Sequence, residues 1–198
     1  MKNVVLVVMD TARYDAIIEN KNIFYEIKNL EKIGCRYTSV FASAPWTFPS
    51  HSGIFSGQYS SKHGASAASK RFREHTPTIV EAFENTSYET VAVSNNTWIS
   101  EEFGFARGFE TFVKTWQYVQ ADTDLGEIAR TEEGADKLRA VARRLFDGNP
   151  LANVANAVYG QFLRNRGDDG AKRTNEWLSD WLDGRDDDRP FFLFVNYL

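Results

Sequence analysis

The sequence contains very little cysteine and has no excess of charge of one sign. The single cysteine, Cys35, excludes an intrachain disulfide and a cysteine-rich zinc site, and this usage is typical of a reducing compartment. We expect Cys35 to be a small buried residue. The 23 Lys and Arg residues against 27 Asp and Glu residues leave a net charge of −4, without the basic stripe of a nucleic-acid or anionic-membrane binder. We therefore expect no nucleic-acid partner.

Long apolar runs are also absent. The first apolar run, Val4 to Met9, follows a single Lys and stops at Asp10, which is too short for a signal peptide or a membrane-spanning helix. We expect no membrane segment and a cytoplasmic location. What the chain does contain is a composition of 42% hydrophobic and 14% aromatic residues over 198 positions, which suffices for the core of a globular domain.

Short apolar runs alternate with amphipathic segments along the chain. Strands are predicted at Val4–Met9, Arg36–Phe41, Glu89–Ser94 and Pro190–Leu198. The run Val4–Met9 is continuously apolar, a pattern typical of a strand buried on both faces of a parallel sheet. Helices are predicted from Ile23 to Ile33, Ser50 to Phe55 and Thr78 to Phe83, whereas Pro45 and Pro49 exclude regular helix from Ser43 to Pro49. The alternation predicts an α/β fold with a mostly parallel sheet between helices.

We expect a single domain over residues 1–198 with a helical insertion at about 123–184. Three helical stretches make up this insertion: Thr123 to about Leu145, Leu151 to Leu163, and a segment that contains Trp177 and Trp181. The chain then returns to the sheet as its final strand.

Two polar segments early in the chain indicate an anion site. Asp10 and Thr11 directly follow the first strand, at the edge where open α/β sheets bind ligands. Pro45 to Gly53 open a helix, and a helix N-terminus offers unpaired N–H groups to a phosphate or sulfate group. A carboxylate beside an anion is useful if it holds a divalent metal ion that bridges to the anion. Thr47 would then be placed as a nucleophile, because a threonine hydroxyl needs a base or a metal to react.

A simpler interpretation of the same residues is available. Ser and Thr are ordinary N-cap residues, so on local chemistry alone those near Thr47 would be assigned to capping the helix. The wider sequence context favours the nucleophile over the helix cap.

Val4 to Asp10, Thr47 to Gly57 and the spacing between them resemble the N-terminal half of the sulfatase family, in the alkaline phosphatase superfamily. Thr47-Phe48-Pro49-Ser50-His51 resembles the family signature Cys/Ser-x-Pro-Ser-Arg, whose first residue is the nucleophile, and Lys62-His63-Gly64 resembles its His-Gly ending. The resemblance implies a metal-dependent hydrolase or transferase that acts on sulfate or phosphate esters. Its substrate would be a small anionic ester, which could be carried on a glycan or a lipid.

The resemblance also implies roles for particular residues. Asp10, Thr11 and Thr47 correspond to metal-binding positions, for Ca, Mg, Mn or Zn, and Thr47 and His51 to catalytic ones. Asn95, Asn96 and His63 are the candidates for substrate binding. For His63, a structural hydrogen-bonding role is an equal alternative, since an isolated histidine carries little signal.

The departures from the family pattern matter as much as the matches. Threonine cannot be oxidised to formylglycine, so no formylglycine is expected, and Thr47 resembles the phosphate-directed branches of the superfamily. Thr11 stands where sulfatases have a second aspartate, and His51 replaces the signature arginine. The Pro-His and Asp/Asn-His-Gly segments that complete the family's metal site have no counterpart up to Leu198. We therefore expect the C-terminal half in the same or another polypeptide; the alternative is a truncated, catalytically inactive anion-binding remnant.

Overall fold

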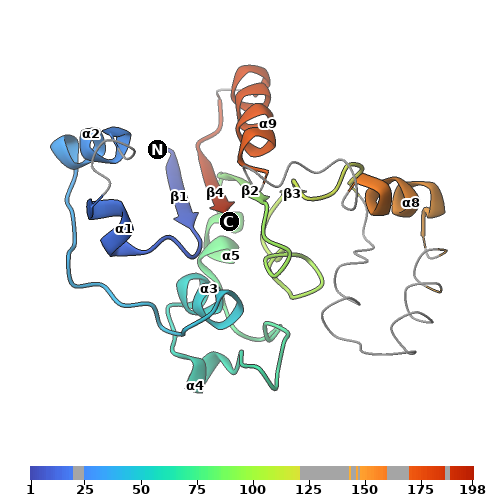
Figure 1. Ribbon diagram of the computed structural model, residues 1–198, viewed down its shortest axis with the longest axis horizontal. Helices are drawn as coiled ribbons and strands as arrows, with labels where there is room; N and C mark the ends of the chain where they lie inside the picture. The colour runs from blue at the N-terminus through green and yellow to red at the C-terminus, as the bar shows by residue number, and fades with distance from the viewer. Residues whose placement is uncertain (20–24, 121–142, 144–145, 147, 160–169, 186–187) are drawn as a thin grey trace.

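The structure is a computed structural model, and it describes residues 1–198 except 20–24, 121–142, 144–145, 147, 160–169 and 186–187 (Figure 1). The elements are β1 (Val4–Met9), α1 (Tyr14–Glu19), α2 (Tyr25–Ile33), α3 (Thr47–Ser56), α4 (Ser60–His63), α5 (Ile79–Glu84), β2 (Glu89–Ser94), β3 (Thr111–Lys114), α8 (Pro150–Val158), α9 (Ala171–Gly184) and β4 (Phe191–Tyr197).

The described strands form one parallel sheet in the order β1-β4-β2-β3. The last strand of the chain, β4, therefore lies between the first strand and β2. Its pairing with β1 runs from Val4 beside Phe192 to Met9 beside Tyr197. Because the strands are parallel, their carboxyl ends meet at one edge of the sheet, and the α/β fold with a parallel sheet is confirmed.

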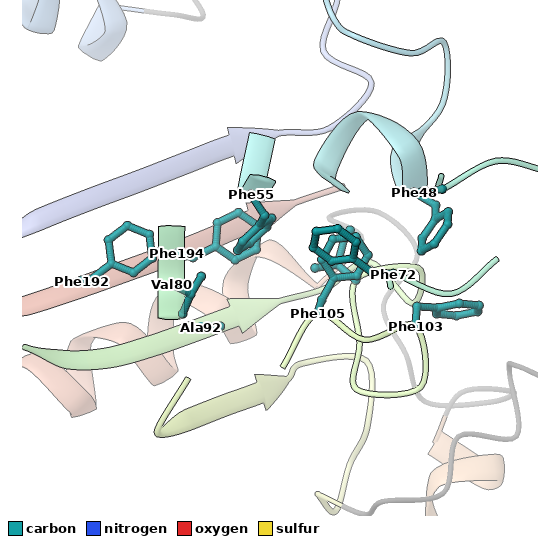
Figure 2. Packing of buried hydrophobic residues seen from close by; sticks show 11 residues of the cluster. Phe48, Phe55, Phe72, Val80, Ala92, Phe103, Phe105, Phe192 and Phe194 are labelled. Atoms are coloured by element: carbon teal, nitrogen blue, oxygen red, sulfur yellow. The ribbon is translucent and has the colours of Figure 1, made fainter. Parts of the chain in front are cut away.

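Each face of the sheet has its own hydrophobic core. On the face towards α3 and α5, Phe55, Phe192 and Phe194 belong to a cluster rich in phenylalanine that lies between these helices and the sheet (Figure 2). On the other face, Leu193 and Val195 pack with Trp177 and other residues of α9. The apolar side chains of α9 thus cover this face of β4.

The first strand is buried on one face only, so the prediction of burial on both faces is wrong for β1. Val4, Leu6 and Val8 pack against the phenylalanine-rich core. The alternate side chains are exposed, with Val5 and Val7 each at 53% and Met9 at 41%. In Figure 1, α9 lies near β4 and away from β1, which explains the difference.

The segment Arg36–Phe41 was predicted to be a strand, and this is wrong. It is irregular and exposed, and no described strand pairs with it. Cys35, at the start of this exposed segment, is also exposed rather than buried. Conversely, the short strand β3 was not predicted, although its Thr, Phe and Val favour strands; Thr111–Lys114 pair with β2, from Val91 to Ser94.

Helix α3 begins earlier than predicted. Thr47 is its first residue, although Pro49 was taken to exclude regular helix up to that position. Proline is tolerated in the first turn of a helix, because the N–H groups there have no partner within the helix. This early start places Thr47 at the helix N-terminus.

The predicted helical insertion is described only in part. Helices α8 and α9 fall within two of the expected stretches, whereas most of the stretch from Thr123 to Leu145 lies outside the described residues. Among the described helices, none is long and apolar enough to cross a membrane.

Candidate functional site

Asp10 is held at the carboxyl edge of the sheet by a tight turn. Its backbone N–H donates to the Tyr197 carbonyl at 2.7 Å, and Ala12 N–H donates to the Met9 carbonyl at 3.3 Å. Thr11 has a φ of 62°, and it is the one non-glycine residue with positive φ in the described part of the chain. This conformation matches the third position of a type II turn, where glycine or asparagine is usual. A β-branched residue there is strained, so the turn beside Asp10 stores energy.

Thr47 contacts Asp10 directly from the start of α3. Its hydroxyl donates to Asp10 Oδ2 at 2.8 Å. The N-cap of the helix is Trp46, which makes no side-chain capping bond, so Thr47 does not cap α3. Thr78 shows what a capping threonine does in this protein, since it forms a full capping box with Glu81 at α5. The capping interpretation is therefore wrong for Thr47, and the N-terminus of α3 has no capping side chain.

Asn96 reaches the same carboxylate from the end of β2. Its side-chain amide donates to Asp10 Oδ2 at 2.7 Å, and its Oδ1 accepts from Trp98 N–H at 3.0 Å. Asn96 is almost fully buried. The structure thus brings together Asp10, Thr47 and Asn96, three of the predicted site residues, from three separate elements.

The neighbouring Asn95 is placed differently. Its backbone N–H donates to the Asn196 carbonyl at 3.3 Å, and its side chain lies beside Gly170 at the start of α9. Of the two adjacent asparagines, Asn96 is therefore the one whose side chain bonds the Asp10 carboxylate.

His51 lies one turn after Thr47 and is 2% exposed. Its Nδ1 is 2.9 Å from the Thr47 carbonyl oxygen, and its Nε2 is 3.2 Å from Asn196 Nδ2. Burial lowers the pKa of His51 below its usual range, against the opposing effects of the Thr47 carbonyl and the Asp10 charge. The imidazole is therefore neutral at pH 7.

His63 lies at the end of α4 and is fully buried. Its Nδ1 accepts from Ala65 N–H at 3.1 Å, and its ring packs edge-on against Phe72. Burial and then the nearby Arg73 charge lower its pKa. These contacts favour the structural alternative, and a substrate-binding role of His63 stays a prediction, since within the described residues it bonds none of Asp10, Thr47 and Asn96.

A cavity of about 750 Å³ opens beside Asp10 and Thr47. Thr11 and His51 also line it, together with residues 40–46, Met9 and Ile54. Among the residues that the structure describes, no lysine or arginine belongs to this lining. Within that part of the chain, the N-terminus of α3 is the feature that offsets the charge of an anion in the cavity, and a bound cation would add to it.

The described residues supply only part of a metal site. Asp10 contributes a carboxylate and Thr47 a hydroxyl, and both hydrogen bonds to Asp10 end on Oδ2, so Oδ1 accepts none from the described chain. No group of three or more His, Cys, Asp or Glu residues in the described ranges could hold an ion. Zinc takes four ligands and calcium six to eight, so these donors fit one side of a coordination shell.

Two further residues of this site were not predicted from the sequence. Asn196 and Ser94 are fully buried neighbours on β4 and β2. Asn196 is the first polar residue after the apolar run Phe191–Val195, and it lies at the carboxyl end of a strand. The same signal identified Asp10 after β1, and it could have identified Asn196.

Comparison with known proteins identifies the family of this chain. The model of the Sulfatase family matches residues 2–198. A search of curated proteins gives no match.

Two solved structures share the fold. One is BT4656 in complex with its substrate D-glucosamine-2-N,6-O-disulfate, with a TM-score of 0.62 and 15% identity over 98% of this chain and 34% of that one. The other is the phosphonate monoester hydrolase of Agrobacterium radiobacter, with a TM-score of 0.61 and 15% identity over 100% of this chain and 41% of that one. The chain thus spans well under half the length of either. With the family model covering nearly every residue, the chain belongs to the sulfatase family.

Proposed function

We propose that this site hydrolyses or transfers an anionic sulfate or phosphate ester, with the hydroxyl of Thr47 as the nucleophile. The observation that carries the proposal is the 2.8 Å hydrogen bond from Thr47 Oγ1 to Asp10 Oδ2 at a helix N-terminus without a capping side chain. The hydroxyl of Thr78 also donates to a carboxylate, that of Glu81, but it accepts from Glu81 N–H as part of a helix cap. Thr47 caps no helix, and its carboxylate partner lies beside a cavity.

The proposed reaction follows from the direction of that hydrogen bond. The hydroxyl proton points to Asp10 Oδ2, which increases the negative charge on Oγ1. A bond forms between Thr47 Oγ1 and the sulfur or phosphorus atom, and the bond from that atom to the leaving ester oxygen breaks. Asp10 takes the hydroxyl proton, and the leaving oxygen takes a proton from water. Water or an acceptor hydroxyl then attacks the same sulfur or phosphorus atom, and the bond from that atom to Thr47 Oγ1 breaks. Oγ1 takes back the proton held by Asp10, and the proton of the attacking hydroxyl neutralises the hydroxide left by the first step. No formylglycine takes part.

Asp10, Thr11 and Thr47 are the residues that would hold a divalent ion, be it Ca, Mg, Mn or Zn. When bound, such an ion supplies positive charge, which offsets the anion and lowers the pKa of a coordinated hydroxyl. The described chain provides a single carboxylate here, so further ligands would come from residues outside the described part or from another polypeptide.

The substrate class follows from the lining of the cavity. Apolar side chains such as Trp46 and Ile54 line the same cavity as Asp10 and Thr47, so the group attached to the ester would contact apolar side chains. The structurally similar proteins act on a sulfated sugar and on phosphonate monoesters, which supports a small anionic ester. A glycan or a lipid could carry it, and the low cysteine content supports the cytoplasm as the compartment.

A second candidate function is a binding module that keeps the anion pocket without turnover. One observation favours it: within the described residues, Asp10 is the only acidic side chain that lines the cavity, and no cationic side chain lines it. Such a protein would bind sulfate or phosphate and leave esters intact.

Turnover of phosphodiesters, phosphonates and sulfate esters by the intact gene product, with each divalent metal added, tests the proposal. We expect Thr47→Ala to lower kcat by about 10³-fold or more, since the nucleophile is lost. Thr47→Ser should retain most activity. Thr86→Ala serves as the control, because Thr86 is an exposed threonine in the turn after α5. Unchanged turnover in Thr47→Ala would exclude Thr47 as the nucleophile. Phosphate or sulfate binding without turnover in the wild type would establish the binding module instead.

A further inference from the structure

We infer that Asn196 and His51 form a positioning pair that fixes Thr47, and that His51 acts there as a neutral imidazole with its proton on Nδ1. The kinetic consequence of this pair rests on the function proposed above. Its structural consequence rests on the hydrogen-bond geometry alone.

The chemistry of its two partners determines the tautomer of His51. The Thr47 carbonyl can only accept, so the imidazole Nδ1 that lies 2.9 Å away must carry the proton. Asn196 Nδ2 can only donate, so the imidazole Nε2 at 3.2 Å must be the acceptor. Both ring nitrogens are thus used within the protein, and neither is left to move a proton for the substrate.

The other side of the Asn196 amide faces Ser94. Asn196 Oδ1 lies 3.4 Å from the Ser94 hydroxyl, whose one proton is shared between this oxygen and the Asn96 carbonyl at 3.2 Å. Ser94 is the register neighbour of Asn196 on β2, and both residues are fully buried. The amide nitrogen of Asn196 therefore faces His51, as the tautomer requires.

These contacts close a ring around the nucleophile. Ser94 Oγ accepts from Asn96 N–H at 3.1 Å, and the Asn96 side chain donates to the carboxylate that accepts from Thr47. The ring runs through Thr47, Asp10, Asn96, Ser94, Asn196 and His51 and returns to Thr47. It joins α3 to the carboxyl ends of β1, β2 and β4. Thr47 is thereby held at both its hydroxyl and its carbonyl.

Burial makes this ring a positioning device. In a buried site each hydrogen bond is strengthened by the low dielectric, and a group that loses its partner costs about 1–3 kcal/mol. Loss of the Asn196 donor would leave Nε2 unpaired against the sheet and allow the first turn of α3 to shift. A displacement of about 1 Å at a nucleophile can lower a rate by about 10²-fold. His51 and Asn196 thus act on the reaction through Thr47.

The variant that tests the pair is Asn196→Asp. It keeps the shape of the side chain and replaces the donor that faces Nε2 with a carboxylate oxygen. Asn175→Asp is the matched control, because the exposed Asn175 accepts from the Tyr197 hydroxyl through an oxygen that aspartate retains. Asn196→Ser, which is neutral and too short to reach His51, is the second variant if aspartate prevents folding.

The first readout is the ¹⁵N spectrum of the imidazoles in the chain without added metal or substrate. The chain has three histidines, so His51→Gln assigns the signals of His51. We expect the neutral tautomer with the proton on Nδ1. In Asn196→Asp, His51 should show a protonated Nε2, and the Thr47 methyl signal should move. Asn196→Ser should move the Thr47 signal as well, and Asn175→Asp should change neither residue. A wild-type His51 protonated on Nε2, or a Thr47 signal unmoved in the Asn196 variants, would overturn the inference.

The second readout is kinetic and separates this inference from the proposed function. We expect Asn196→Asp to lower kcat by about 10–100-fold with KM within about twofold, since the substrate contacts remain. If Thr47→Ala abolishes turnover while Asn196→Asp keeps the wild-type kcat, the positioning role is wrong and the proposed function stands. If the wild type itself shows no turnover, the proposed function fails, and the ¹⁵N spectrum and the Thr47 signal still decide on the pair.

Discussion

Strands β1 and β4 lie side by side and both begin with a run of apolar residues, yet they differ sharply in burial. Val7 of β1 pairs with Val195 of β4, and the two residues point to the same face of the sheet. Val195 is 2% exposed, and Val7 is 53% exposed. On that face α9 covers β4, whereas no described helix covers β1. A continuous apolar run therefore predicts a strand, and the neighbouring helices decide how many of its faces are buried.

The polar residues at the carboxyl ends of the two strands also differ in burial. Asn196 of β4 is fully buried and bonds His51, whereas Asp10 after β1 is half-buried and lines the cavity. The two strand ends therefore contact different parts of Thr47. The β4 side reaches its backbone carbonyl through His51, and the β1 side accepts from its hydroxyl beside the cavity.

The largest effect that tests this contrast is expected at Phe194. Its ring packs against Phe55 with centroids 5.0 Å apart, and it has no exposed surface. Phe194→Ala should lower the free energy of unfolding by about 3–5 kcal/mol, because it removes buried contacts and leaves a cavity. Leu6→Ala, at its register partner on half-buried β1, should cost about half as much. Urea unfolding measures both, and equal losses would contradict the asymmetry between the strands.

A smaller and cleaner test uses the same residue type on both strands. Val195→Ala should lower the free energy of unfolding by about 2 kcal/mol, since two buried methyl groups are lost against α9. Val7→Ala should cost about 0.5 kcal/mol, mainly through the lower strand propensity of alanine. A loss of about 2 kcal/mol at Val7 would show that its side chain is covered in solution.

The sequence predicted the fold well where a short stretch of residues has the composition of the element that it forms. Strands β1, β2 and β4 are apolar and rich in β-branched or aromatic residues, so their positions could be predicted closely. Asp10 and Asn96 could be predicted as neighbours, because polar residues at the carboxyl ends of parallel strands share one edge of the sheet. Thr47 could be added to them from the helix N-terminus that it opens and from the family resemblance. Their hydrogen bonds confirm that they lie together.

Other features depend on contacts that no local pattern encodes. Arg36–Phe41 has a strand-like composition but no strand beside it, whereas Thr111–Lys114 becomes β3 because β2 offers an edge. The pairing of His51 with Asn196 joins residues far apart in the chain, and it depends on β4 lying between β1 and β2. Strand order of this kind is a property of the whole sheet, so the sequence at either residue cannot reveal it.

The smallest effect is expected at Thr11, where β1 turns into the site through a left-handed residue. A non-glycine residue in this conformation costs about 1–2 kcal/mol, and glycine loses about 0.5–1 kcal/mol more chain entropy on folding. Thr11→Gly should therefore raise the free energy of unfolding by about 0.5 kcal/mol, and Thr11→Asn should give a similar gain, since asparagine tolerates this region. Thr11→Ala keeps a Cβ and is the control, with little change expected. Urea unfolding measures all three, and destabilisation by glycine would mean that contacts of the Thr11 side chain outweigh the strain. Thr11→Asn keeps a side-chain oxygen, whereas Thr11→Gly and Thr11→Ala do not. A weaker affinity for divalent metal in the glycine and alanine variants, but not in the asparagine variant, would show that the strained turn serves to present that oxygen to an ion.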